Sequence, residues 1–240
     1  MANTPTNDSP LTDSPYGYWL AFGLEVEDSP HQFCGENLID GANCPACKKP
    51  LLRLLSLKAN DARLHLGHPE FPFIHLLYCW TCSIPFGHFV YQMQRTGGVE
   101  LLSWESDYQW AFGTDGPYEG YTGLFPGQAV GLICISEEEN RKMQLYVEKG
   151  IESPVEGDRY LYGPRHQIGG SPLIFNAEGS IRCLLCEAEI PLLAAISDDA
   201  GPLTSTKSSV DKTFTGNYGT QMIFHYCRSC AVVSAYHSND

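Results

Sequence analysis

The sequence predicts a mostly β protein, a β-rich α+β fold in which two duplicated halves pack into one pseudo-symmetric unit. Three observations support this prediction. The chain contains four Cys-x-x-Cys pairs, whereas random placement of its cysteines would give roughly 0.4. Short apolar runs typical of strands lie beside these pairs. The same order of motifs occurs in both halves, which is the signature of an internal repeat.

The composition is that of a globular protein, and the charge excludes several classes of partner. The chain has 240 residues, of which 43% are hydrophobic and 18% are charged, so it can bury a sizeable core. Its net charge of −13 opposes binding to nucleic acid or to an anionic membrane surface. The chain lacks a long apolar run and a secretory signal. We therefore expect a cytoplasmic protein whose cysteines stay reduced.

The paired cysteines have the spacing of metal ligands. Two thiolates three positions apart on a tight turn reach one Zn²⁺ ion, and two such turns complete a tetrahedron. The first two pairs are 31 residues apart, the last two are 40 apart, and 100 residues separate the two groups. The sequence therefore predicts two structural Zn²⁺ ions, each bound within one zinc-ribbon-like half. The predicted ligands are Cys44, Cys47, Cys79 and Cys82 in the first half, and Cys183, Cys186, Cys227 and Cys230 in the second.

Two alternatives to this ligand set remain open. The pairs from different halves can share an ion, although a unit that closes its own site is simpler to duplicate. Redox chemistry of the thioredoxin kind requires one Cys-x-x-Cys that opens a helix after a strand. Both intervals within the halves exceed the roughly 15 to 20 residues usual between such pairs, so we expect additional strands inside each ribbon.

Three aligned segments indicate the duplication. Residues 44–61 align with 183–200, and residues 74–88 align with 222–236. Upstream, His31-Gln32 corresponds to His166-Gln167. The alternative is that all zinc ribbons look alike at their cysteine turns. We divide the chain into a disordered tail, a first repeat, a connecting β and helical segment and a second repeat, which span residues 1–15, 16–92, 93–165 and 166–240.

One helix is predicted near residues 137–149. Ser136 and Glu139 form a capping box, the acidic residues 137–139 suit the helix N-terminus, and Lys149 suits its C-terminus. Its apolar side is formed by Met143, Tyr146 and Val147. Residues 197–220 are polar and are expected to form a mobile insertion in the second ribbon. An aromatic group in the middle segment is expected to pack in the core, or else to bind a partner; its members are Trp104, Tyr108, Trp110, Tyr118 and Tyr121.

Four further residues are candidates for chemistry. Cys34 and Cys134 lie outside the pairs, and each is either a nucleophile or, more commonly for free cysteines, an apolar filler. His31 and His166 recur in the two halves. They are candidate ligands or bases, but a hydrogen bond that stabilises a turn is the simpler expectation. The Gly169-Gly170 pair is expected to form a close backbone turn and not a phosphate loop.

The second half resembles a known family. The motifs are RHQIGGSPLIF, CLLCEAEIPLLAAIS and a late HYCRSC, which are similar to those of the bacterial YwqG-like domain and of its relative, the C-terminal domain of programmed cell death protein 2. The matching residues are Ile168, Gly169, Gly170, Pro172, Cys183, Cys186, Cys227 and Cys230. The resemblance is weaker in the first half, where HQFCG replaces HQIGG. It implies a binding domain that serves as a chaperone for a client protein, and not an enzyme.

These observations favour a non-catalytic protein-interaction or chaperone-like module, with zinc as a structural metal and an acidic surface for a basic protein client. One alternative is an enzyme whose site lies between the halves and uses Cys134 or His166. The other is a nucleic-acid-binding zinc ribbon, for which the lysines and arginine of residues 48–53 would have to form a local basic patch.

Overall fold

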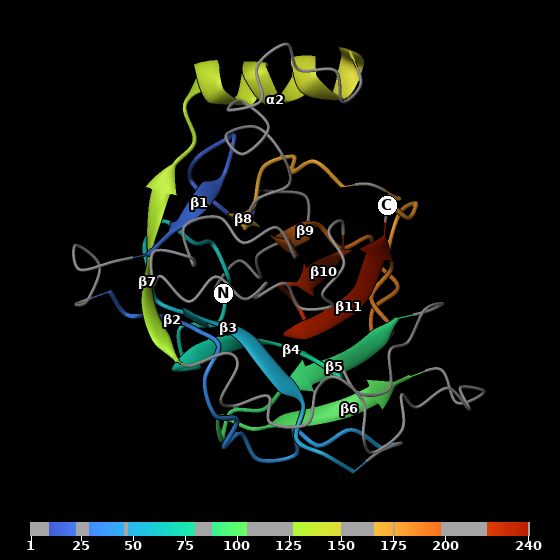
Figure 1. The fold of residues 1–240 in the computed structure, drawn as a ribbon. Coiled ribbons are helices and arrows are strands. Elements are labelled where there is room, and N and C mark those ends of the chain that lie inside the picture. Colours follow the sequence, from blue (N-terminus) through green and yellow to red (C-terminus); the bar gives the residue numbers. More distant parts are fainter. Residues whose placement is uncertain are drawn as a thin grey trace, which may run out of the picture.

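The structure is a computed structural model that describes residues 10–22, 29–45, 48–79, 88–104, 127–149, 166–174, 176–197 and 220–239. Within these ranges it contains eleven strands and one helix (Figure 1), which confirms the mostly β prediction. The strands are β1 (Tyr18–Ala21), β2 (His31–Phe33), β3 (Leu52–Lys58), β4 (Phe73–Tyr78), β5 (Phe89–Met93), β6 (Val99–Ser103), β7 (Gln128–Cys134), β8 (Gln167–Ile168), β9 (Leu192–Ser197), β10 (Thr220–Cys227) and β11 (Val232–Asn239), and the helix is α2 (Glu137–Lys149). None of the helical residues described forms a segment long and apolar enough to cross a membrane.

The strands form one antiparallel sheet in the order β4-β3-β2-β7-β1-β8-β9-β10-β11-β5-β6. The sheet curls, so that its edge strand β4 contacts β5 and β11 (Figure 1). Strands β3 and β4 lie between the first two cysteine pairs, and β9 and β10 lie between the last two. The expected additional strands are therefore present in both intervals.

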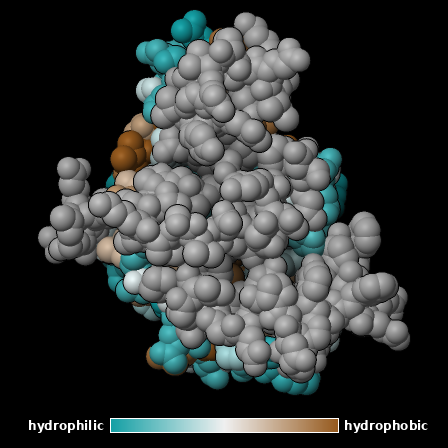
Figure 2. Space-filling model, viewed as in Figure 1, coloured by the Kyte–Doolittle hydropathy of each residue, from teal (hydrophilic) through white to brown (hydrophobic). Residues whose placement is uncertain are grey.

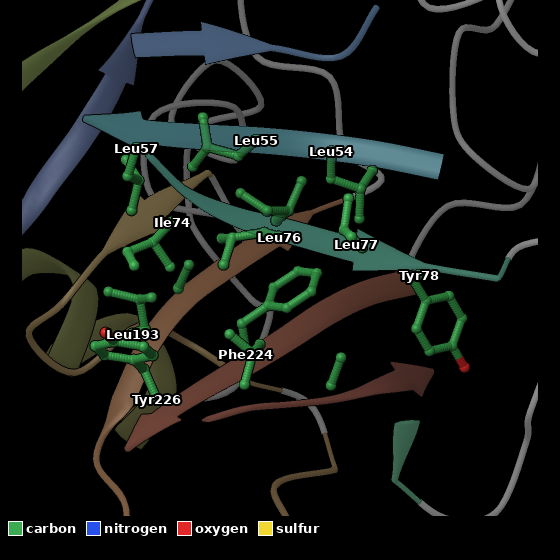
Figure 3. Close-up of a cluster of buried hydrophobic side chains, with 14 of the residues drawn as sticks. Leu54, Leu55, Leu57, Ile74, Leu76, Leu77, Tyr78, Leu193, Phe224 and Tyr226 are labelled. Atoms are coloured by element: carbon green, nitrogen blue, oxygen red, sulfur yellow. The ribbon is translucent and has the colours of Figure 1, made fainter. Parts of the chain in front are cut away.

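The main core lies between the two hairpins β3–β4 and β9–β10. Figure 3 shows side chains from the first hairpin pointing toward those of the second. The labelled residues are Leu54, Leu55, Leu57, Ile74, Leu76, Leu77 and Tyr78 from β3 and β4, and Leu193, Phe224 and Tyr226 from β9 and β10, all buried. Strands buried on both faces read as nearly continuous apolar runs, as LRLLSLK and FIHLLY do. Each large side chain stabilises the fold by about 1.5–3 kcal/mol.

A buried tyrosine hydroxyl holds the edge strand in the curled sheet. The Leu77 N–H on β4 donates to Tyr91 Oη at 2.8 Å, and the Tyr91 hydroxyl donates to the His75 carbonyl at 2.7 Å. Burial raises the pKa of Tyr91, so the hydroxyl stays protonated. An unpaired strand edge is open to wrong pairing. The Tyr91 side chain from β5 thus satisfies two backbone groups at the free edge of β4.

The two motif histidines hold equivalent strands. His31 Nδ1 accepts the Lys58 N–H at 3.1 Å, and His166 Nδ1 accepts the Ser197 N–H at 3.2 Å. The donors are the last residues of β3 and β9. Both histidines are buried and each accepts a stabilising hydrogen bond, but the bond holds the end of a strand and not a turn as expected.

The register around these histidines also recurs. In both halves the short strand at the histidine motif, β2 or β8, pairs antiparallel with the long strand that follows the first cysteine turn, β3 or β9. Each long strand has a bulge where it pairs with its hairpin partner, β4 or β10. The paired residues are Gln32–Ser56 and Phe33–Leu55 in the first half, and Gln167–Ala195 and Ile168–Ala194 in the second. The bulges skip Leu54 and Leu193, which occupy equivalent places.

The residues after each motif form a close backbone turn, as expected. Cys34 and Gly169 have φ of 54° and 63°, and Gly35 and Gly170 have φ of 93° and 64°. A Cβ on Gly170 would approach the Tyr16 carbonyl oxygen to 2.1 Å. Both a left-handed conformation and the close contact therefore require glycine at this position.

Residues 10–15 correct the expectation of a disordered tail over residues 1–15. Leu11 is 3% exposed, and Thr12 forms an antiparallel bridge with Leu64. The Asp13 N–H donates to the Arg63 carbonyl at 3.0 Å. The polar composition of the segment concealed one apolar side chain that has a place in the core. Residues 1–9 lie outside the described ranges.

Strand β7 gives the middle segment an unexpected place. The sequence assigned residues 93–165 to a connection that bridges or covers the halves, but β7 lies inside the sheet, between β2 and β1. Figure 2 shows apolar atoms at the left edge of the view, over β7. Ile133 on this strand is 56% exposed. Trp104 is 38% exposed and does not pack in the core as expected. The other four aromatic residues of the predicted group lie outside the described residues.

The predicted helix α2 begins and ends at the residues that the sequence indicated. The Ser136 N–H donates to Glu139 Oε2 at 2.8 Å, and the Glu139 N–H donates to Ser136 Oγ at 3.2 Å, which is a capping box. Met143 is buried with Trp19 and Ile135, while the side chains of Tyr146 and Val147 lie outside the description. Figure 2 shows hydrophilic atoms over the first part of α2. Met143 thus anchors the helix to this buried cluster.

The Tyr91→Phe substitution tests the hydroxyl at the sheet edge. We expect it to lower the free energy of unfolding by about 1–3 kcal/mol, because it leaves a buried N–H and a buried carbonyl without this partner. Urea denaturation measures the loss. Tyr226→Phe is the matched control, because the buried Tyr226 hydroxyl makes one hydrogen bond among the described residues, to the Leu66 carbonyl at 3.2 Å. This control should lower the free energy of unfolding by less than Tyr91→Phe does. Equal losses in the two variants would contradict the special role of Tyr91.

Candidate metal centre

Four cysteine sulfurs meet at one end of the second half. The Sγ atoms of Cys183, Cys186, Cys227 and Cys230 all lie within 4.8 Å of one another. Cys186 Sγ and Cys227 Sγ are 3.7 Å apart. A tetrahedral ion with metal–sulfur bonds of about 2.3 Å places its sulfur ligands about 3.8 Å apart. The spacing therefore fits a four-thiolate metal site, closed within the second half.

Two turns position these cysteines. Cys183 and Cys186 lie in the turn that precedes β9, where Arg182 and Glu189 form an antiparallel bridge. Cys227 is the last residue of β10, and Cys230 lies in the tight turn that leads into β11. The hairpin register therefore presents the second pair at the tip, beside the turn that carries the first.

The first turn has a specific backbone pattern, and it recurs in the first half. The N–H of the first cysteine donates to the carbonyl five residues later, and its carbonyl accepts the N–H four residues later, from a residue with left-handed φ. These residues are Cys44, Lys49 and Lys48 in the first half, and Cys183, Ala188 and Glu187 in the second. The bridge between Arg182 and Glu189 also has its counterpart, between Asn43 and Pro50. In the second half this folding directs the backbone N–H groups of Leu185 and Cys186 toward Cys183 Sγ.

The site has an apolar floor and an open side. Cys183 and Cys227 are buried in a small cluster with Val90, Ile190 and Val232. Cys186 is exposed and Cys230 is partly exposed. The Gln92 side chain from β5 donates to the Cys230 carbonyl at 2.8 Å. The metal position is thus anchored to the sheet on one side and reachable from solvent on the other.

The thiols differ in acidity. Burial raises the pKa of Cys183 to about 11, and it raises the pKa of Cys230 as well. Burial also opposes ionisation of Cys186, but hydrogen bonds from the Ala188 N–H and from the other thiols outweigh it and lower the pKa of Cys186. A divalent ion reverses this pattern, because its charge removes the protons from every ligand thiol. A donor set of four thiolates suits Zn²⁺ or iron.

Two of the four ligands predicted in the first half lie among the described residues. Cys44 and Cys79 are both buried in the main core cluster. Cys47 and Cys82 lie outside the described residues. The predicted first site therefore stays a prediction, supported by the shared backbone pattern at Cys44.

The remaining candidate residues have structural contacts. Cys34 is buried, and burial raises its pKa, as in an inert apolar filler. Cys134 is exposed, and its Sγ lies 3.3 Å from Ser14 Oγ. His31 Nε2 pairs with Asp61 at 2.9 Å, and burial lowers the pKa of this histidine. Arg53 in the lysine and arginine segment donates to the Cys34 carbonyl and is not part of an open basic patch.

Sequence reasoning missed a pocket beside the four cysteines. Its volume is about 520 Å³. It is lined by His68, Glu70, Phe71, Gln92, Met93, Gln94, Arg95, Thr96, Leu185, Ser229, Cys230 and Ala231. These residues come from four separate segments, so no local motif indicates the pocket. The sign of the pocket in the sequence is the pair Leu184-Leu185 inside the third Cys-x-x-Cys motif.

Comparisons with protein-family models, with curated proteins and with solved structures give no match to this chain. The resemblance to the YwqG-like domain and to programmed cell death protein 2 therefore stays a prediction, which rests on the motif residues alone.

Single cysteine substitutions test the centre. We expect Cys183→Ser and Cys227→Ser each to lower the bound metal by about one equivalent per chain, because removal of one thiolate opens the tetrahedron. Elemental analysis of protein purified under reducing conditions measures the loss. Cys134→Ser is the control and should retain the wild-type metal content. Unchanged metal in both ligand variants would show that the cluster is not a metal site.

Proposed function

We propose that this protein is a zinc-braced, non-catalytic module that binds a basic protein client in the cytoplasm. The observation that carries the proposal is the convergence of four thiols from two turns on one point. A Zn²⁺ ion with four cysteine ligands has no open position to activate water, so its role is structural.

The proposal includes two such ions. One is held by Cys183, Cys186, Cys227 and Cys230, and the other by Cys44, Cys47, Cys79 and Cys82. The second assignment is supported by the matching turns at Cys44 and Cys183. It is also supported by the place of Cys79, which is buried and directly follows β4, just as Cys227 is buried at the end of β10. Each ion could contribute about 10 kcal/mol to folding.

We further propose that the two halves arose by duplication and exchange their first strands. β1 precedes the first histidine motif but pairs with β8, while β7 precedes the second motif but pairs with β2. The registers are equivalent, and the pairs are Gln32 with Ala129 and Gln167 with Trp19. Because Trp19 of β1 corresponds to Ala129 of β7, Ala21 corresponds to Gly131 two residues further along. Ala21 and Gly131 also pair with each other. That relation is expected where a pseudo-two-fold axis crosses the sheet.

The client is inferred from charge and from the family resemblance. A net charge of −13 steers positively charged partners toward the surface and repels nucleic acid. The resembled family implies a chaperone-like domain. The enzyme hypothesis has no comparable support among the described residues, because His166 Nδ1 is occupied by a backbone N–H, and Cys134 contacts a serine hydroxyl and a carbonyl. Binding is therefore the function that the residues favour.

The metal stoichiometry tests the structural part of the proposal. We expect about two Zn²⁺ ions per chain in freshly purified, reduced protein, and cooperative unfolding when a strong chelator removes them. Elemental analysis and circular dichroism provide the two measurements. A content below one equivalent, or a fold that survives complete removal of metal, would refute the structural role.

The charge of captured partners tests the binding part. The immobilised zinc-loaded protein should retain basic polypeptides from a cell extract at low salt and release them as the salt concentration rises, because screening weakens steering and ion pairing. Mass spectrometry identifies the polypeptides, and the chelated, unfolded protein serves as the control. Retention of acidic polypeptides alone, or of none, would contradict the proposal.

A further inference from the structure

Two large apolar side chains are exposed at the tip of the turn that carries Cys183 and Cys186. Leu184 is 54% exposed and Leu185 is 50% exposed. The equivalent positions in the turn at Cys44 hold Pro45 and Ala46. Since the same backbone pattern forms with these smaller residues, the turn itself does not require leucine. Two adjacent exposed leucines form an apolar patch of the kind that marks interaction sites, whereas a singly exposed apolar side chain such as Leu38 is ordinary.

The leucines adjoin the pocket beside the four cysteines. Leu185 lines it together with Ser229 and Cys230 from the second cysteine turn. Phe71 and Met93 line the same pocket and are buried, so they provide an apolar surface inside it. Its volume of about 520 Å³ lies in the range of pockets that hold small ligands, and it is large enough to admit a side chain of a partner.

The charges around the pocket and the turn favour a cation. Among the charged residues that line the pocket, Glu70 and Arg95 balance, and Glu70 already pairs with His68 at 3.1 Å. The turn that carries the leucines has two exposed carboxylates, Glu187 and Glu189, against one guanidinium group, that of Arg182. A bound Zn²⁺ ion with four thiolates adds a net charge of about −2. A segment that carries lysine or arginine is therefore attracted to this face, and an acidic one is repelled.

We propose that this pocket, together with Leu184 and Leu185, is the docking site for a basic protein segment that presents a large apolar side chain between lysines or arginines. The apolar side chain enters the pocket against Phe71 and Met93 and covers the two leucines. The flanking cations pair with Glu187 and Glu189, which are exposed on the same turn as the leucines. This inference rests on the proposed client binding and locates it on the second cysteine turn.

Three synthetic peptides of equal length test the site on the full-length, zinc-loaded protein. The first alternates lysine with leucine, the second replaces each leucine with serine, and the third replaces each lysine with glutamate. We expect the first to bind at low salt and the other two to bind at least about tenfold more weakly, because the site requires both an apolar anchor and a positive charge. Fluorescence anisotropy measures affinity, and amide shifts in nitrogen-15 spectra should move at residues 92–96 and 184–185.

A double substitution, Leu184→Ser with Leu185→Ser, should weaken the lysine–leucine peptide by about tenfold or more. Leu38→Ser is the matched control, because Leu38 is 82% exposed in the first half, and it should change the affinity less than twofold. Glu187→Gln with Glu189→Gln should weaken binding several-fold and reduce its dependence on salt. Metal content and unfolding midpoint should match the wild type in every variant, since the altered side chains are exposed.

Each result decides the inference. Equal binding by the double leucine variant and the wild type would overturn the site, while basic clients captured from an extract would still support the proposed function. Binding of the glutamate–leucine peptide as tight as that of the lysine–leucine peptide would overturn the charge preference. Failure of the wild type to bind any of the peptides would overturn the docking site, independently of the metal stoichiometry.

Discussion

The burial of the β3–β4 hairpin against the β9–β10 hairpin is the interaction on which the rest of the structure depends. Side chains such as Leu54, Leu76 and Phe224 are fully buried between the two hairpins. The cysteine turns lie at the ends of these hairpins, with Cys183 before β9 and Cys227 at the end of β10. Once the core fixes the strands, the tips cannot move independently, and the four sulfurs are held within reach of one ion.

The features predicted correctly from the sequence are those set by neighbouring residues. The capping box between Ser136 and Glu139 defines the start of α2, and a Cys-x-x-Cys spacing places two thiols on one turn. The histidine motif was also interpretable, because its hydrogen bond to the end of the next long strand recurs in both halves. In each case the signal lies within a few residues or is present twice.

The features that the sequence did not indicate depend on contacts between distant segments. Nothing near β7 shows that it enters the sheet between β2 and β1. The core position of Leu11 depends on a bridge from Thr12 to Leu64, more than fifty residues away. The pocket beside Cys230 is assembled from four segments. Pairing across such distances is decided by the global core, and a local pattern of residues carries no record of it.

The crossed strands at the centre of the sheet have a consequence for how metal binding acts on the whole protein. Because β1 pairs with β8, and β7 pairs with β2, the segments before and after residue 104 complete each other's sheet. Tyr78 Oη also contacts His237 Nδ1 at 2.9 Å, which joins the end of β4 to β11. Neither half can lose its strand pairing without removing hydrogen bonds from the other. An ion bound at Cys183, Cys186, Cys227 and Cys230 therefore stabilises residues far beyond its own turns, and its free energy of binding is shared by the entire sheet.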